Sequence, residues 1–179
     1  VASVARTDAP AGPRALLEVT DLTVRFRTRG PSRAVVHAVT EVSVQIAPGE
    51  TLGLIGESGS GKSTVARAVS QLLRGQRVKV TGSISLNGVR LDQLSKRELR
   101  AQRHRMQMIF QDPNDALDPR MTVRQSIEEP LRILGRAGDD ELGTTVERAL
   151  DTVGLAPAMA DRRPHELSGG QRQRVNIAR

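Results

Sequence analysis

Residues 56–64 have the types and spacing that a phosphate-binding loop requires. They read Gly-Glu-Ser-Gly-Ser-Gly-Lys-Ser-Thr and fit the pattern G-x-x-x-x-G-K-[ST]. The glycines let the backbone curl so that successive N–H groups point inward at an anion. Lys62 can reach the β- and γ-phosphates of a nucleotide, and the Ser63 hydroxyl can ligate Mg²⁺. The predicted phosphate-binding residues are Gly56, Glu57, Ser58, Gly59, Ser60, Gly61, Lys62, Ser63 and Thr64.

A strand before this loop and a helix after it must hold it in place. Residues 51–55 are typical of a short buried strand, and residues 65–73 are typical of a helix. A helix that starts at the loop directs its partial positive charge at a bound anion. This context favours a phosphate site over the alternative, a glycine-rich turn that binds nothing.

The residues before the loop predict an antiparallel sheet. Alternating apolar residues favour strands at residues 16–26, 35–39 and 42–46. Within the first strand the alternation shifts by one residue at Thr20 and Asp21, which predicts a bulge or a tight bend there. Short strands of this kind, ahead of a strand–loop–helix unit, suggest a sheet laid against an α/β core.

The residues after the loop begin with a further strand. Residues 79–86 favour it, and Asn87-Gly88 indicates a hairpin turn. Ser95 and Glu98 form a capping-box pattern for a helix that ends near Arg103. Residues 106–110 are apolar and predict one more strand.

From Met121 onward the pattern is helical. Residues 123–134 predict a helix ended by Gly135, and residues 139–153 predict a second helix followed by Gly154. A third helix follows Ser168. The latter half of the chain is therefore expected to be helical.

Composition narrows the class of protein. The chain has 179 residues, of which 37% are hydrophobic, enough for one domain with a core. It has no cysteine, which excludes a disulfide framework and a thiolate metal site. The net charge of +7 is spread along the chain, and Phe26 and Phe110 are the only aromatic residues. Nucleic-acid binding on an aromatic platform is therefore not expected.

The start of the chain and its apolar runs bear on membrane association. Residues 1–14 are small and polar and have no apolar centre, so we expect a tail or linker and not a signal peptide. No apolar run is long enough to span a bilayer. The chain itself is therefore not expected to cross a membrane.

Three motifs in order carry a resemblance to a known family. They are Gly56 to Thr64, then Phe110-Gln111-Asp112-Pro113, then Leu-Ser-Gly-Gly-Gln at residues 167–171. They resemble the Walker A, Q-loop and signature motifs of ATP-binding cassette (ABC) ATPases. Residues 111–122 and 163–170 look most like the oligopeptide, dipeptide and nickel importer branch. The resemblance covers about residues 16–179.

The resemblance implies a fold class and a division of the chain. The fold is α/β, a P-loop NTPase core with an antiparallel β subdomain and an α-helical subdomain, truncated before the Walker B strand. Residues 15–179 would then be a partial ABC ATP-binding domain. The helical subdomain and its connections would occupy about residues 112–165.

The resemblance also implies roles for single residues, with ATP and Mg²⁺ as cofactors. Gln111 corresponds to the glutamine that approaches Mg²⁺ and senses the membrane partner, so Ser63 and Gln111 are the candidate metal ligands. Ser168, Gly169, Gly170 and Gln171 match the loop that binds the γ-phosphate of ATP held by a second subunit. Phe26 either stacks on adenine or is a strand residue that faces the core, and the sequence leaves both open.

The activity that the resemblance implies is ATP hydrolysis that powers an importer of peptides or related solutes. The implied partners are a second ABC ATPase subunit, integral membrane permease subunits and, indirectly, an extracytoplasmic solute-binding protein. The implied location is the cytoplasmic face of the membrane, as a peripheral protein. Two alternatives stay open: an ABC ATPase without a transporter, and a nucleotide-binding remnant without turnover.

Several polar residues are not expected to do chemistry. His37, His104 and His165 are the only histidines, and we interpret all three as ordinary loop or surface residues. Nothing supports Glu57 or Asp112 as a catalytic base. Arg172 and Arg174 follow the signature and could pair with carboxylates or lie near phosphate, but exposure to solvent is favoured. The candidate site therefore consists of the three motifs alone.

The sequence ends within the signature helix, ahead of the Asp-Glu pair that the family carries next. In the family that Asp helps to hold Mg²⁺ and the Glu activates the attacking water. We therefore expect these residues alone to lack catalysis and to fold poorly. Leu52, Leu54 and Ile55 are expected to lie on an unpaired apolar strand.

Overall fold

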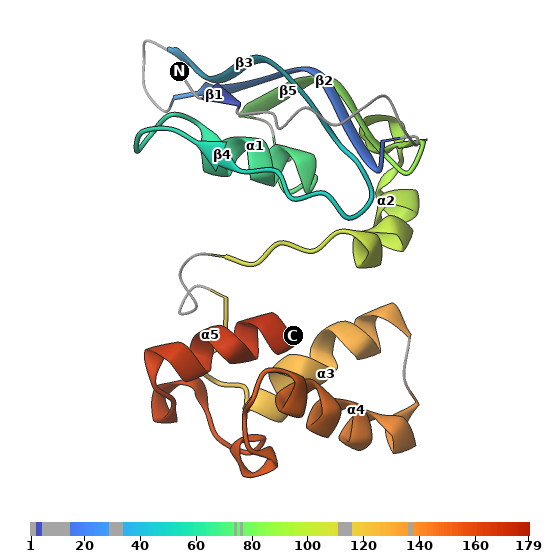
Figure 1. The fold of residues 1–179 in the computed structure, drawn as a ribbon, viewed down its shortest axis with the longest axis vertical. Coiled ribbons are helices and arrows are strands. Elements are labelled where there is room, and N and C mark those ends of the chain that lie inside the picture. The colour runs from blue at the N-terminus through green and yellow to red at the C-terminus, as the bar shows by residue number, and fades with distance from the viewer. Residues whose placement is uncertain are drawn as a thin grey trace. The chain divides into compact units, whose positions relative to one another are not determined.

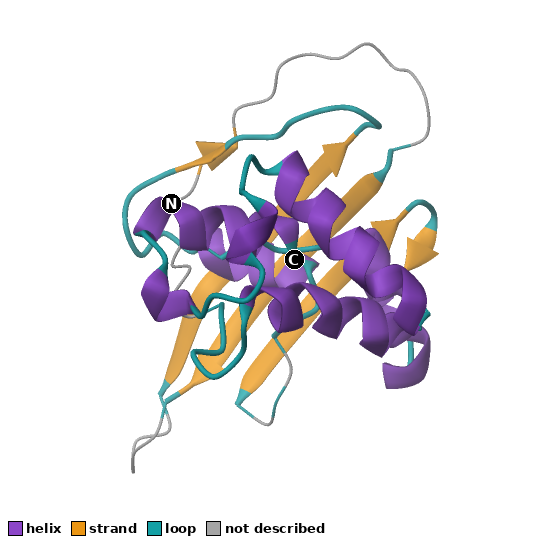
Figure 2. Ribbon diagram, turned by 90° about the horizontal axis from the view of Figure 1, so that it is seen from below, coloured by secondary structure: helices purple, strands orange, loops and turns teal. Residues whose placement is uncertain are grey.

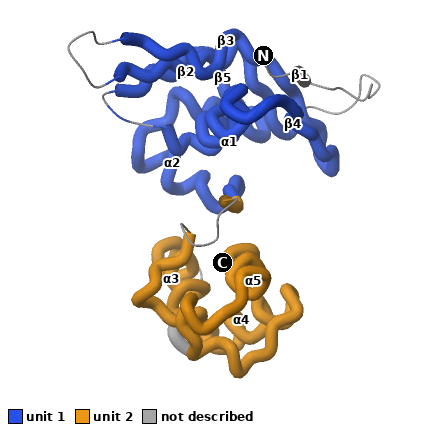
Figure 3. The backbone as a smooth tube through the Cα atoms, turned by 90° about the vertical axis from the view of Figure 1, so that its left-hand side faces the viewer, with its two compact units in different colours: residues 1–108 blue, residues 109–179 orange. Residues whose placement is uncertain are grey.

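A computed structural model describes residues 3–4, 15–28, 34–73, 75, 77–110, 116–135 and 138–179. The chain divides into two compact units, residues 1–108 (unit 1) and residues 109–179 (unit 2), which Figure 3 shows in blue and orange. Each unit has its own hydrophobic core. The two motifs that are described, the phosphate loop and the signature, lie in different units.

Unit 1 is built on an antiparallel sheet, as the sequence predicts. The strand order is β3-β2-β5-β6, and Figure 2 shows the strands in orange. The strands are β2 (Leu17–Arg27), β3 (Val35–Ile46), β5 (Val78–Leu86) and β6 (Val89–Arg90). The two strands predicted at 35–39 and 42–46 form the single strand β3, because both halves pair with β2. Between the two halves, Glu41 takes a positive φ of 51°.

The predicted bulge in β2 is confirmed. Asp21 has a φ of 50°, and the pairing of β2 with β5 shifts register between Thr20 and Thr23. On the neighbouring strand Gly82 faces this bulge, and a Cβ there would lie 2.6 Å from the carbonyl oxygens of both Thr20 and Asp21. Only glycine fits that close approach. The hairpin turn at Asn87 and Gly88 is confirmed as well, since Leu86 pairs with Val89.

The strand before the phosphate loop is shorter than predicted. It is β4 (Leu54–Ile55), and it pairs antiparallel with β1 (Ser3–Val4), which comes from the stretch expected to be a tail. The prediction that Leu54 and Ile55 lie unpaired is therefore wrong. Leu52 lies outside the strand and packs against the core of unit 1. Ile55 keeps an exposed fraction of 70%.

Helices close one face of the sheet in unit 1. Helix α1 (Lys62–Val69) packs against β2 and β3 (Figure 1). It begins three residues before the predicted helix and ends four residues earlier, where Gln71 takes a positive φ of 56°. The other short elements are η1 (Leu91–Gln93), α2 (Lys96–Gln102) and η2 (Arg103–Arg105). The buried core residues are Val19, Leu22, Val24, Val39, Val44, Val65, Ala68, Ile84, Leu86, Leu91 and Leu99.

The capping box at the start of α2 is confirmed, whereas the strand predicted after it is absent. The Glu98 N–H donates to Ser95 Oγ at 3.3 Å, and the Ser95 N–H donates to Glu98 Oε2 at 2.9 Å. Residues 106–110 have no regular structure. The prediction of a strand there is wrong because, within the described residues, no strand pairs with this stretch.

Unit 2 is helical, as predicted. Helix α3 (Val123–Leu134) has the predicted bounds and ends at Gly135, and α4 (Asp139–Thr152) ends one residue before its predicted end. The remaining elements are η3 (Pro157–Met159), η4 (Pro164–Glu166) and α5 (Gly169–Ala178). The buried core residues are Leu117, Val123, Ile127, Val146, Leu150, Leu155, Ala160, Leu167 and Val175. Across the described parts of both units, every helix is too short or too polar to cross a bilayer.

Candidate nucleotide-binding site

The phosphate loop connects β4 to α1 through one residue that must be glycine. Gly61 is the N-cap of α1 and has a left-handed backbone, with a φ of 96°. A Cβ at this position would collide with the carbonyl oxygen of Ala38 in β3. Only glycine combines this φ with this close contact. The loop is therefore held against the antiparallel sheet at the point where the helix begins.

Lys62 holds the loop from inside. Its Nζ donates to the carbonyl oxygens of Gly56, at 2.8 Å, and Glu57, at 2.6 Å. A third, longer bond of 3.4 Å goes to Ser60 Oγ. An ammonium group has three hydrogens, so all three have acceptors within the loop. The positive charge of Lys62 lies within the curl of residues 56–61.

The start of α1 leaves its first N–H groups without intrahelical partners. The first helical bond runs from the Val65 N–H to the Gly61 carbonyl at 2.9 Å. Within the described residues, no side chain accepts a hydrogen bond at this helix start. The N–H groups of Lys62, Ser63 and Thr64 thus carry the positive end of the helix dipole without a cap. An anion is the partner that such a helix start favours.

The residues that could hold Mg²⁺ here are few. Ser63 is exposed at the first turn of α1 and offers a hydroxyl oxygen. Among the described residues, no group of three His, Asp or Glu side chains is placed to bind a metal. This donor set fits a Mg²⁺ ion held mainly by phosphate oxygens and water, with Ser63 as a protein ligand. Gln111, the other predicted ligand, lies outside the described residues, as does Asp112.

The signature loop in unit 2 forms a capped helix start. Ser168 is the N-cap of α5, and its Oγ accepts from the Gln171 N–H at 3.2 Å. The Gln171 side chain accepts from the Ser168 N–H at 2.8 Å in return. This box leaves the N–H groups of Gly169 and Gly170 at the exposed helix start. A hydroxyl oxygen that accepts a bond keeps its own hydrogen, so Ser168 can still donate to a phosphate.

Sequence reasoning missed the role of the arginines of α5. Arg172 is half-buried, and its Nη1 donates to the carbonyl oxygens of Leu167, at 2.7 Å, and Pro164, at 3.3 Å. The prediction that it is exposed to solvent is therefore wrong. Arg174 is exposed, as predicted, but it also donates to the Gly154 carbonyl at 3.2 Å. These bonds join α5 to backbone carbonyls of irregular segments that precede it in the chain, so no periodic sequence pattern predicts them.

Phe26 and the histidines have ordinary surroundings. Phe26 is half-buried in β2 and packs against the core of unit 1, which fits the core-facing alternative for this residue. Its stacking on adenine stays a prediction. His37 in β3 and His165 in η4 are exposed, and His104 in η2 is half-buried. These positions agree with the interpretation of all three as loop or surface residues.

Comparison with known proteins identifies the family. Residues 39–179 match the sequence profile of the ABC transporter family. Over 168 residues, 92% of its length, the chain is 49% identical to the glutathione import ATP-binding protein GsiA of Escherichia coli K12. It is equally identical to GsiA of Salmonella paratyphi A. The chain spans 26% of the length of these relatives.

Solved structures of ABC ATPases resemble the fold of this chain. The dimeric post-hydrolysis structure of the ATP-binding cassette MJ0796, bound to ADP and Pi, superposes with a TM-score of 0.73 at 28% identity. The superposition covers 90% of this chain and 67% of the MJ0796 chain. CbiO1 from Clostridium perfringens, part of the ABC transporter complex cbiONQ, gives 0.67 at 26% identity and covers 92% of this chain and 60% of that one. The chain belongs to the ABC transporter family.

Proposed function

We propose that this chain is the nucleotide-binding part of an ATPase subunit that powers an ABC importer of peptides or related small solutes. The observation that carries the proposal is the start of α1, where uncapped N–H groups and the charge of Lys62 converge on one loop. The importer direction and the peptide-like solute rest on the relatives named for glutathione import. Glutathione is itself a small peptide.

A few residues would bind the phosphates of ATP and the Mg²⁺ ion. The backbone N–H groups of residues 56–64 and the Lys62 ammonium hold the β- and γ-phosphates of ATP. Mg²⁺ neutralises phosphate charge, and Ser63 would hold it together with Gln111. Glu57 is exposed and its carbonyl oxygen accepts a hydrogen bond from Lys62 Nζ, so it acts through its backbone and not as a base. In phosphoryl transfer the protein contributes mainly by positioning the reacting groups and by stabilising their negative charge.

The signature loop acts on the nucleotide of a second ABC ATPase subunit. Ser168 Oγ and the N–H groups of Gly169 and Gly170 would donate to the γ-phosphate held by that subunit's loop. The cassette MJ0796, which was solved as a dimer, supports an arrangement of two subunits. Closure around ATP would drive integral membrane permease subunits at the cytoplasmic face of the membrane. A solute-binding protein outside the membrane would deliver the solute.

Replacement of Lys62 by alanine tests the proposal. In the complete protein, Lys62→Ala should weaken ATP binding by at least about 100-fold, since it removes a charged hydrogen-bond donor from the phosphates. The chain has no tryptophan, so a fluorescently labelled nucleotide reports the affinity. Lys96 is the matched control, because it is exposed and also occupies the first position of a helix. Equal binding by Lys62→Ala and wild type would refute the assignment.

Measurements of ATP turnover separate the importer ATPase from the two alternatives. An importer ATPase hydrolyses ATP and does so faster with its permease subunits, whereas a remnant binds nucleotide without releasing phosphate. Phosphate release, measured with and without the permease, decides between them. A soluble ABC ATPase would show turnover that the permease does not change.

A further inference from the structure

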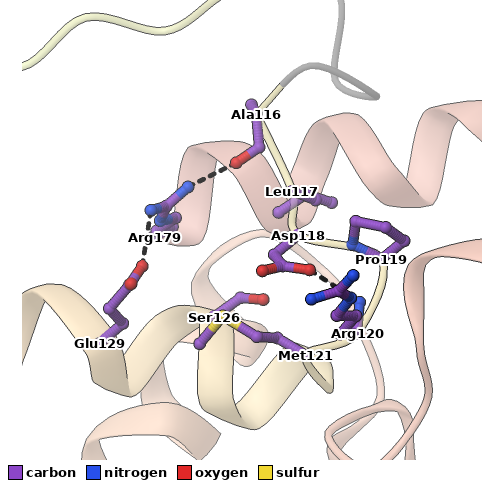
Figure 4. A pocket seen from close by; sticks show the side chains of 9 residues that line it. All are labelled: Ala116, Leu117, Asp118, Pro119, Arg120, Met121, Ser126, Glu129 and Arg179. Atoms are coloured by element: carbon purple, nitrogen blue, oxygen red, sulfur yellow. Dashed lines mark hydrogen bonds and ion pairs between the residues drawn. The ribbon is translucent and has the colours of Figure 1, made fainter.

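Three segments of unit 2 meet at one arginine. They are the end of α5, the middle of α3 and the irregular segment of residues 116–121 that precedes α3 (Figure 4). Each segment also places a residue in the same buried core, namely Val175, Ile127 and Leu117. Arg179 lies at the surface above this shared core. Its side chain hydrogen-bonds both of the other segments.

The guanidinium of Arg179 bridges two acceptors on different segments. Its Nη1 donates to the Ala116 carbonyl oxygen at 2.5 Å, and its Nη2 donates to Glu129 Oε2 at 2.8 Å. Figure 4 shows the group between these two oxygens, beside a pocket of about 590 Å³. Residues 116–121, Ser126, Glu129 and Arg179 line this pocket. A planar guanidinium with two bonds fixes both partners in direction as well as distance.

Stability alone is a weak reason for this arrangement. The side chains of Arg179 and Glu129 are 34% and 38% exposed. Ion pairs with this exposure contribute little to the free energy of unfolding because solvent screens them. What the pair does provide is a fixed relation between Ala116 and the end of α5. Ala116 follows Gln111 by five positions, and α5 begins at the signature loop.

We propose that Arg179 is a positioning residue that makes the signature loop and the segment after Gln111 move as one body. This inference rests on the proposed function. A helix transmits displacement from its end to its start, so a shift of residues 116–121 is carried along α5 to Ser168. Without Arg179 the two segments keep their core contacts but lose their fixed orientation. Closure around the nucleotide then becomes less productive, whereas the phosphate loop in unit 1 is unaffected.

The test compares four variants of the complete protein: Arg179→Ala, Arg179→Lys, Glu129→Ala and the double alanine variant. Arg179→Ala should lower kcat about tenfold, with the Kd for labelled ATP unchanged within about twofold. Arg179→Lys should lose most of this activity as well, because a single ammonium does not reproduce the planar, two-bond bridge to Ala116 and Glu129. The double variant should lose no more than Arg179→Ala, since Glu129 acts through that arginine. A full kcat in Arg179→Ala, or losses that multiply in the double variant, would overturn the proposal.

Hydrogen exchange gives a second readout that does not depend on turnover. Arg179→Ala should raise amide exchange in peptides that cover residues 116–121 and 168–179. The matched control is Arg124→Ala, which breaks the exposed Arg124–Asp161 ion pair of the same unit and should leave both peptides and kcat unchanged. Unchanged exchange at residues 116–121 in Arg179→Ala overturns the link, whatever the activity. Wild-type turnover no faster than that of Lys62→Ala instead refutes the proposed function.

Discussion

The two helices that start at sequence motifs, α1 at the phosphate loop in unit 1 and α5 at the signature loop in unit 2, start in opposite ways. α1 begins at a left-handed glycine without a side-chain cap, and a lysine occupies its first position. α5 begins at Ser168 with a complete capping box. A helix start without a cap leaves its positive end to be neutralised by an anion, whereas a capped one is satisfied alone. We infer that the first loop binds its phosphate alone and the second completes a site that is already formed.

The capping box of α5 is not by itself a sign of function. The same box caps α2, through Ser95 and Glu98, and α3, through Thr122 and Gln125. What sets α5 apart is the pair of glycines that follows the cap. They let a ligand approach the helix start closely without meeting a side chain. The difference between the three capped helices is therefore steric.

The largest loss of nucleotide affinity is expected from a substitution at Gly61, where α1 begins. Replacement of Gly61 by alanine should weaken nucleotide binding by about 100-fold or more, because the new Cβ meets the Ala38 carbonyl and φ is left-handed. Gly59 is the matched position: its φ is +80°, yet a Cβ there has no described neighbour within 4 Å. Gly59→Ala should therefore show a clearly smaller loss, from backbone strain alone. Calorimetric titration with ATP measures both, and equal losses would contradict the steric argument.

Sequence patterns predicted what depends on neighbours along the chain. The bounds of α3, the bulge at Asp21 and the capping box of α2 were all predicted, because each is visible in the order of residue types over a few neighbouring positions. The strand at residues 106–110 was predicted wrongly, because a strand also needs a partner that local pattern does not reveal. Of the site, the phosphate loop and the signature followed from motifs. The bonds of Arg172 and Arg179 span irregular segments and could not be predicted.

A smaller effect is expected at the cap of α5. Ser168→Ala should cost about 1 kcal/mol of stability, the usual value for an N-cap. It should also lower ATP turnover by more than about tenfold, because we propose that this hydroxyl donates to the nucleotide of the second subunit. Ser95→Ala removes the same cap from α2 and should cost similar stability without loss of turnover. Thermal melts and phosphate release report the two quantities, and parallel changes in both variants would show that α5 serves only as a structural helix.

The smallest effect concerns acid sensitivity in unit 1. Hydrogen bonds from the Arg90 guanidinium hold the pKa of the Asp92 carboxyl below its ordinary value, with a further bond from the Ile84 N–H. The stabilisation from this carboxylate is therefore full above its ordinary pKa and is lost as pH falls through the lowered pKa. Asp92→Asn should lower the melting temperature at pH 7 by about 2 °C. That difference should vanish in strong acid, and a difference independent of pH would exclude this mechanism.

Because Lys62 already hydrogen-bonds to its own loop, a bound nucleotide has to replace acceptors that are in place before it arrives. Its ammonium already has three acceptors, from Gly56, Glu57 and Ser60. A phosphate must replace neutral carbonyl and hydroxyl oxygens, and it gains only the difference between a charged and a neutral acceptor. Anions of low charge density, such as chloride, gain little from this exchange, whereas the dense charge of a triphosphate gains much. The loop can thus stay selective in a cell where simple anions far outnumber nucleotides.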